Sequence, residues 1–178
     1  MAKYDDASWH YGGDYPADLP NENASTHIGM FLAWCINNDL ISDELREDAT
    51  EKINNVKSRQ MTGGEFLMQV CDEKLIDSDL SELGQQFAND YYADNMSEFA
   101  ENFGGYMDDY CIFDEGETIY HVEDTWENYD IMAKILDERF VEWKDFTKNI
   151  SPNKPLVSHS TAEKNTQKKS FWGRLFGK

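Results

Sequence analysis

Basic residues, proline and cysteine are all scarce in this 178-residue chain, and each shortage narrows the classes of protein it can be. Only four prolines interrupt it, which leaves long stretches free to form helices. The three cysteines, Cys35, Cys71 and Cys111, lie among apolar residues and lack the CxxC or Cys/His spacings that hold zinc. We therefore expect reduced core cysteines rather than a disulfide framework or a zinc finger.

Long hydrophobic runs are also missing. No stretch approaches the roughly 18 consecutive apolar residues that a membrane-spanning helix needs. The first residues, MAKYDD, have neither the basic region nor the apolar region of a secretory signal peptide. We therefore expect a cytoplasmic protein.

The shortage of basic residues gives the chain a large negative charge. It has 16 Lys and Arg against 35 Asp and Glu, for a net charge of -19. A polyanion of this size repels nucleic acid and anionic lipid over a Debye length. We expect no nucleic-acid partner.

The charge is divided unevenly along the chain. Residues 148–178 hold seven basic residues and one acid, a net of 7 - 1 = +6, so residues 1–147 hold 9 basic and 34 acidic residues, a net of 9 - 34 = -25. From residue 151 the composition turns to Ser, Thr, Asn, Lys, Gln and Pro, which is typical of a linker. We predict an acidic helical domain at 1–147, a flexible linker at 148–169 and a short basic-aromatic tail at 170–178.

Apolar residues are plentiful in the acidic part, with 24 aromatics in the whole chain. Their spacing indicates a mainly α fold, an irregular or orthogonal bundle of about six helices. The segment 26–36 is apolar on every face and is predicted to be the central, buried helix. The other predicted helices cover residues 42–56, 62–71, 78–91, 95–103 and 124–146.

Local motifs predict where several of these helices begin. Ser42 is a good N-cap, Thr62 and Glu65 fit a capping box, and Asp124 can cap the last helix. We expect residues 4–16 to form an ordered loop. The apolar residues that flank the polar run 114–117 could close a small β-hairpin near 112–122.

No motif in the sequence specifies a reaction. There is no GxSxG elbow, and the two glycines after Thr62 are followed by Glu65, which would repel a phosphate. The histidines allow one enzymatic alternative, a metal-assisted hydrolase or small-molecule enzyme that uses His10, His27 and His121 with nearby Asp and Glu. We favour hydrogen-bonded struts between the opening loop and the bundle, and we expect no catalytic residue, cofactor or metal.

The tail interleaves aromatic and basic residues. As a helix it would place apolar groups on one face with cations beside them, a pattern typical of weak anchors to anionic membranes. The tail could therefore contact a membrane surface or a partner, or it could hang free. Its candidate residues are Lys168, Lys169, Phe171, Trp172, Arg174, Leu175 and Phe176.

Four segments carry a family resemblance: YDDASWHYGGD at 4–14, THIGMFLAW at 26–34, CDEK at 71–74 and YHVEDTW at 120–126. In these segments the chain resembles a family of small bacterial proteins of unknown function, over about residues 4–145. The resemblance implies a bacterial cytosolic protein and carries no reaction. It marks as candidate binding residues Trp9, His10, Asp14, His27, Asp72, Glu73, His121, Glu123 and Asp124.

Together these features favour a binding protein over an enzyme. Acidic single-domain proteins can cover the basic active-site clefts of toxins, with charge accelerating the encounter. We therefore expect an immunity or antitoxin protein that neutralises a basic bacterial toxin, such as an interbacterial effector. The alternatives are the metal-assisted enzyme and a peripheral membrane adaptor that binds through the tail.

Overall fold

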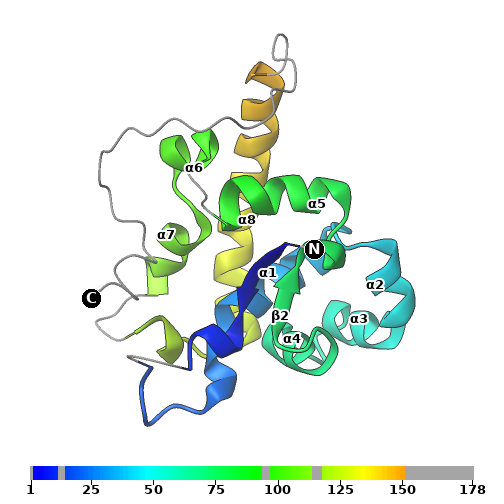
Figure 1. The fold of residues 1–178 in the computed structure, drawn as a ribbon, viewed down its shortest axis with the longest axis vertical. Coiled ribbons are helices and arrows are strands. Elements are labelled where there is room, and N and C mark those ends of the chain that lie inside the picture. Colours follow the sequence, from blue (N-terminus) through cyan, green and yellow to red (C-terminus); the bar gives the residue numbers. More distant parts are fainter. Residues whose placement is uncertain (1, 12–14, 94–96, 114–117, 151–178) are drawn as a thin grey trace.

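The computed structural model describes residues 2–11, 15–93, 97–113 and 118–150. The described residues form mainly helices, as the sequence predicts, together with one two-stranded sheet (Figure 1). The α-helices are α1 (Thr26–Asn37), α2 (Asp43–Asp48), α3 (Thr50–Lys57), α4 (Gly63–Val70), α5 (Glu82–Phe87), α6 (Glu98–Phe103), α7 (Tyr106–Tyr110) and α8 (Trp126–Ile150). Within the described ranges, none of them is both long and apolar enough to cross a bilayer.

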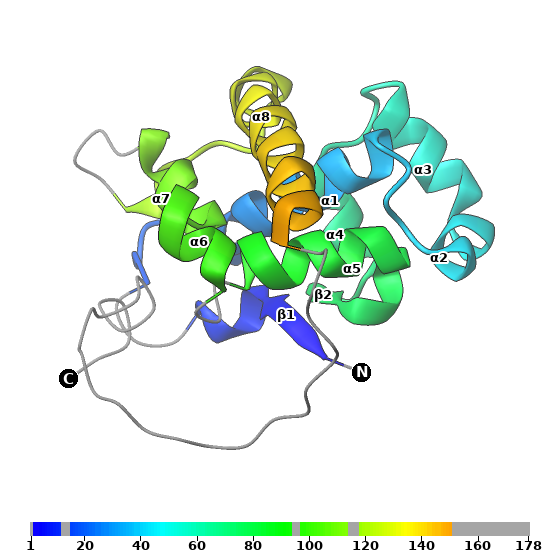
Figure 2. The ribbon, with the colours of Figure 1, turned by 90° about the horizontal axis from the view of Figure 1, so that it is seen from above.

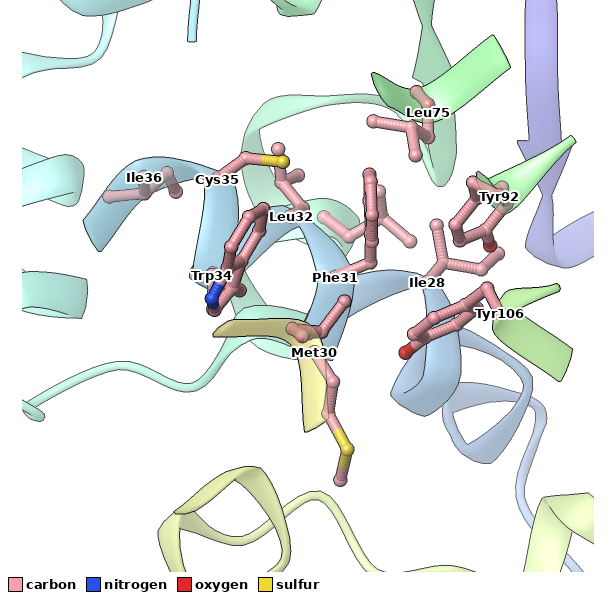
Figure 3. Packing of buried hydrophobic residues seen from close by; sticks show 14 of the residues in the cluster. Ile28, Met30, Phe31, Leu32, Trp34, Cys35, Ile36, Leu75, Tyr92 and Tyr106 are labelled. Atoms are coloured by element: carbon pink, nitrogen blue, oxygen red, sulfur yellow. The ribbon is translucent and has the colours of Figure 1, made fainter. Parts of the chain in front are cut away.

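Helix α1 is the centre of the core, as its sequence predicts. Every residue from Thr26 to Ile36 is buried. In Figure 3 its side chains point in all directions, Phe31 and Ile28 toward Tyr92 and Tyr106. The rings of Phe31 and Tyr92 lie 4.8 Å apart and those of Phe31 and Tyr106 5.4 Å apart. Burial of so many large side chains is the main stabilising contribution to a fold of this size.

Helix α4 packs against α1 through glycines. A Cβ atom at Gly63 would lie 1.9 Å from the carbonyl oxygen of Gly29, and one at Gly29 would lie 2.1 Å from the amide nitrogen of Gly64. Only residues without a Cβ allow the two backbones to approach this closely. The THIGMF and TGGEF segments therefore fix the position of α4 on α1.

Helix α8 lies over α1, and the small sheet lies on the opposite side of α1 (Figure 2). The apolar stripe of α8 buries Tyr129, Met132, Leu136 and Trp143. Two indole nitrogens fix it in place: Trp34 Nε1 donates to Asp137 at 2.9 Å, and Trp143 Nε1 donates to Asp90 at 2.8 Å. These two contacts fix α8 to α1 and to the turn that follows α5.

The predicted helix starts are partly confirmed. Ser42 caps α2 by accepting from Leu45 N at 3.1 Å, and Thr62 and Glu65 form the expected capping box of α4. The start expected near 78 is wrong, because residues Asp77–Asp79 form a 3-10 turn and α5 begins at Glu82 behind the N-cap Ser81.

Two longer predicted helices also differ from the structure. The segment expected as one helix over 42–56 is divided into α2 and α3 at Ala49, whose φ and ψ of -122° and 25° are not helical. The segment expected to be helical over 95–103 begins its helix, α6, at Glu98, and the helix ends at Phe103 as predicted, with Gly104 at its C-cap.

Asp124 does not cap the last helix. Thr125 takes that role, because its Oγ1 accepts from Asn128 N at 3.2 Å. The Asp124 carboxylate instead accepts a hydrogen bond from Thr62 Oγ1 at the start of α4. A tertiary contact has replaced the local one that the sequence predicts.

The sheet is not at the predicted position. Strand β1 (Lys3–Asp6) comes from the segment expected to be a loop and pairs antiparallel with β2 (Lys74–Ile76). The hairpin expected near 112–122 is wrong, because the described residues there form 3-10 turns, Cys111–Phe113 and Ile119–His121. The Tyr120 side chain is buried in the core, where its hydroxyl forms a hydrogen bond with His10. The segment therefore packs inward as a turn and does not form the predicted strand.

Helix α8 continues to Ile150, three residues past the expected end of the acidic domain. The rest of the expected linker and the whole basic-aromatic tail, Lys168 to Phe176 included, lie outside the described residues.

Candidate functional site

The candidate site is a cluster of three ionisable side chains in the core, Asp5, His10 and His27. Asp5 ends β1, His10 follows the 3-10 turn Ala7–Trp9, and His27 lies in the first turn of α1. His10 Nε2 donates to Asp5 Oδ1 at 3.1 Å, and His27 Nε2 donates to Asp5 Oδ2 at 3.2 Å. The imidazole rings meet edge to face with centroids 4.8 Å apart. These contacts join the opening segment to the central helix, as the expected struts would.

Tyrosines surround this cluster. Tyr92 OH donates to Asp5 Oδ2 at 2.7 Å, and Tyr120 OH donates to His10 Nδ1 at 2.9 Å. The backbone is fixed too, because Asp6 N donates to Asp5 Oδ1 at 2.8 Å. Segments far apart in the sequence therefore hold the Asp5 carboxylate in one orientation.

The cluster is closed to solvent. The side chains of Asp5, His10 and His27 are at most 1% exposed. A substrate outside the protein therefore has no direct access to them. Among the described residues, these three form the group of His, Cys, Asp or Glu side chains that could hold a metal ion, with ligand atoms all within 4.8 Å of one another.

Burial and hydrogen bonding shift the pKa values in the cluster. Burial by itself raises the pKa of Asp5, but the hydrogen bonds from His10 and His27 outweigh it and hold that pKa well below its ordinary value. Burial lowers the pKa of His27, and its hydrogen bond to Asp5 only partly opposes this. The structure therefore favours an ionised Asp5 beside a neutral His27.

The hydrogen bonding of the cluster is incomplete at its edge. Within the described part of the chain, His27 Nδ1 and Tyr110 OH are buried side-chain polar atoms without a hydrogen-bond partner. The rings of His27 and Tyr110 lie 5.9 Å apart. Unpaired buried polar atoms are uncommon in folded proteins, so each of these two calls for a specific explanation.

The other predicted site residues lie elsewhere. Trp9 is 48% exposed beneath the ammonium of Lys3, which lies 4.9 Å from its ring centroid. Glu73 accepts from Tyr11 OH at 3.1 Å, and Asp72 pairs with Lys74 at the surface. Asp14 lies outside the described residues.

His121 is separate from the other two histidines. Its Nδ1 lies 3.0 Å from Thr118 Oγ1. His121 takes part in none of the hydrogen bonds described above for the cluster. It lines a surface hollow of about 450 Å³ together with the exposed Ile112 and Ile131 and with Glu123. The structure therefore brings His10 and His27 together and leaves His121 and Glu123 in a different place.

The sequence motifs single out His10 and His27, and they miss the residues that organise the cluster. Asp5 lies five positions before His10, within the YDDASWHYGGD segment, so its partnership with His10 could be inferred from spacing. Tyr92 follows α5 in a π-helical turn, Ala88–Tyr92, and no local signal connects it to Asp5.

The surface carries a second feature, an acidic ridge on α2 and the first turn of α3. We define the acidic ridge as the exposed residues Asp43, Glu44, Glu47, Asp48 and Glu51. Two cations lie within this stretch: Lys52, whose Nζ donates to Gln69 Oε1 at 2.8 Å, and Arg46, which is bound to Asp39 at 3.1 Å. Lys57 binds the same carboxylate at 2.9 Å. The five carboxylates therefore face solvent, and none of them takes part in an ion pair among the described residues.

Most cations elsewhere on the acidic domain are also engaged. Arg59 forms a two-pronged contact with Asp130, and Arg139 binds Asp109 and Glu142. These pairs do not change the total charge. Residues 1–147 hold 9 basic and 34 acidic residues, a net of 9 - 34 = -25.

Comparison with known proteins gives a family and no further relative. A family model described as a domain of unknown function (DUF7832) matches residues 3–122. That range contains Asp5, His10, His27, Tyr92 and Tyr120, so the whole cluster lies within the matched part. No curated protein matches the chain. No solved structure matches it either.

Proposed function

The chain belongs to the DUF7832 family, whose description assigns no activity, and we propose that it is a binding protein that neutralises a cationic bacterial toxin, as immunity and antitoxin proteins do. The proposal places it in the bacterial cytoplasm. The observation that carries it is the acidic ridge on α2 and α3.

The acidic ridge suits the capture of a basic protein. Its carboxylates lie on two short consecutive helices, so a partner cleft could approach several of them at once. Complementary charge raises association rates by roughly 10 to 1000 times at low salt. Desolvated aromatic and apolar side chains then supply most of the affinity in such complexes.

The closed Asp5–His10–His27 cluster is consistent with this proposal. Its side chains are buried, so they stabilise the domain rather than meet a partner. The exposed members of the predicted binding set are Trp9, Asp72 and Glu123, and they lie outside the buried cluster. The binding function therefore rests on the surface of the domain and not on its buried polar core.

The test is co-expression with a toxin encoded beside the gene of this protein. We expect the full chain to restore growth of cells that produce the toxin, and the purified pair to form a complex that weakens as salt rises. If the products of the neighbouring genes neither kill cells nor bind the protein, the proposal is wrong.

A pair of matched variants tests the role of the acidic ridge. The ridge variant carries Glu44→Gln, Glu47→Gln and Glu51→Gln. The control carries Glu98→Gln, Glu101→Gln and Glu138→Gln, which remove the same charge from exposed positions, two of them again in a first helical turn. We expect roughly tenfold slower toxin association for the ridge variant only. Equal slowing of both would mean that total charge, and not the acidic ridge, steers the partner.

A further inference from the structure

The geometry of the buried cluster goes beyond a set of struts. We propose that Asp5, His10 and His27 bind a divalent transition metal, zinc by preference, inside the core of the domain. This metal site is independent of the toxin-binding proposal, because its three residues are buried and none of them belongs to the acidic ridge.

The first argument is the spacing of the ligand atoms. Zinc bonds of 2.0 to 2.1 Å in a tetrahedral arrangement put two ligand atoms about 3.3 Å apart. The two Nε2 atoms lie 3.1 and 3.2 Å from the oxygens of Asp5. All three ligand atoms lie within 4.8 Å of one another. A metal could therefore replace the two His–Asp hydrogen bonds if the ligand atoms that lie farthest apart closed by up to about 1.5 Å, from 4.8 Å to about 3.3 Å.

The second argument is charge. Asp5 is fully buried, and its described hydrogen-bond partners are two imidazoles, a phenol and a backbone amide. These partners are neutral unless an imidazole takes up a proton. A buried carboxylate needs a compensating positive charge, and a bound divalent ion would supply it.

The third argument is the set of outer contacts. Histidines that bind metals usually use their second ring nitrogen to contact a fixed polar group. With a metal on Nε2, His10 carries its proton on Nδ1 and donates it to Tyr120 OH, 2.9 Å away, while Tyr92 OH fixes the Asp5 carboxylate at 2.7 Å. Both hydroxyls come from segments far from β1 in the sequence.

The ligand types select the class of metal. Two imidazole nitrogens and one carboxylate suit zinc and its first-row neighbours, whereas calcium and magnesium prefer oxygen ligands. Three protein ligands leave one position of a tetrahedral ion for water. Because the cluster is closed to solvent, the metal would stabilise the fold rather than react with a substrate.

The test is metal analysis of the full chain, purified without chelators and after removal of any histidine tag. We expect about one zinc ion per chain in the wild type and in the surface control His121→Gln. In His27→Gln and His10→Gln we expect less than about 0.1 per chain. Equal zinc content in His27→Gln and wild type would overturn the site.

Measurements on the wild type decide the matter if the histidine variants do not fold. We expect a strong chelator to lower the melting temperature by about 5 °C or more, and added zinc to restore it. Cobalt(II) bound to the metal-free protein should give the visible absorption of a tetrahedral site. Wild-type protein that contains less than about 0.1 first-row metal ion per chain, and whose melting temperature ignores both zinc and chelator, would overturn the proposal.

Discussion

Thr62 Oγ1 donates a hydrogen bond to Asp124 Oδ2 at 2.5 Å, so the residue that caps α4 is itself held by a residue just before α8. The same carboxylate lies beside the amides of Gly64 and Glu65 at the start of α4. The Asp124 side chain therefore links the N-terminal end of α4, which packs on α1, to the start of α8.

Replacement of Asp124 tests this junction. Asp124→Ala leaves the Thr62 hydroxyl and an α4 amide with weaker partners, and we expect a loss of about 1 to 3 kcal/mol in the free energy of unfolding. The neighbouring exposed Glu123→Ala is the control, with an expected change within about 0.5 kcal/mol. Urea denaturation of both variants measures the difference, and equal stability would show that the junction contributes little.

Asp79 gives a pH-dependent prediction. Burial raises its pKa from 3.8 to about 6, although a hydrogen bond from Ile76 N at 3.0 Å opposes the rise. The folded chain therefore binds more protons than the unfolded chain between these values, and Asp79 makes the protein less stable as the pH rises through this window.

Asp79→Asn keeps an acceptor for Ile76 N and removes the titration. We expect the variant to gain stability relative to wild type between pH 4 and pH 7.5, by on the order of 1 kcal/mol once solvent screening of this partly exposed group is allowed for. Glu82→Gln, at an exposed position nearby, removes the same charge and serves as the control. A constant difference between Asp79→Asn and wild type across this range would contradict the assignment.

Features of the fold that depend on neighbouring residues follow from the sequence. The capping box of Thr62 and Glu65 is local, and so is the apolar pattern that identifies α1 as the buried helix. The pairing of β1 with β2 is different, because it joins Lys3 to Ile76. Strands of four and three residues that meet across such a separation leave no local pattern to detect.

The candidate site shows the same division. The motifs identify His10 and His27, and the short spacing to Asp5 suggests one of the two His–Asp contacts. The other contact, and the approach of Tyr92, depend on how the chain folds back over α1. The prediction that Asp124 caps the last helix is wrong for the same reason, since its partner Thr62 is 62 residues away.

The close approach of α1 and α4 gives a prediction about Gly29. In Gly29→Ala the new Cβ would lie 2.1 Å from the Gly64 amide nitrogen, so the two helices would have to separate. We expect a loss of more than about 4 kcal/mol, or failure to fold. Circular dichroism and thermal melting measure it.

Gly104→Ala is the matched comparison, because its cost has a different origin. Gly104 has φ of +89°, and a Cβ there would meet its nearest neighbour at 3.7 Å, without a clash. We expect only the backbone strain, about 1 to 3 kcal/mol. If Gly29→Ala were no more costly than Gly104→Ala, the tight contact of α1 with α4 would be in error.

The hydroxyl of Tyr92 should stabilise the buried cluster strongly. It donates to the ionised, buried Asp5 at 2.7 Å, and hydrogen bonds to charged groups contribute about 1.5 to 3 kcal/mol. Tyr92→Phe removes the hydroxyl and preserves the ring that packs on Phe31. We therefore expect a loss in this range, measured by chemical denaturation.

Tyr11→Phe is the control, since its hydroxyl donates to Glu73 in a part-buried position and its removal should cost less than about 1 kcal/mol. Equal losses for the two variants would mean that burial does not strengthen the contact with Asp5.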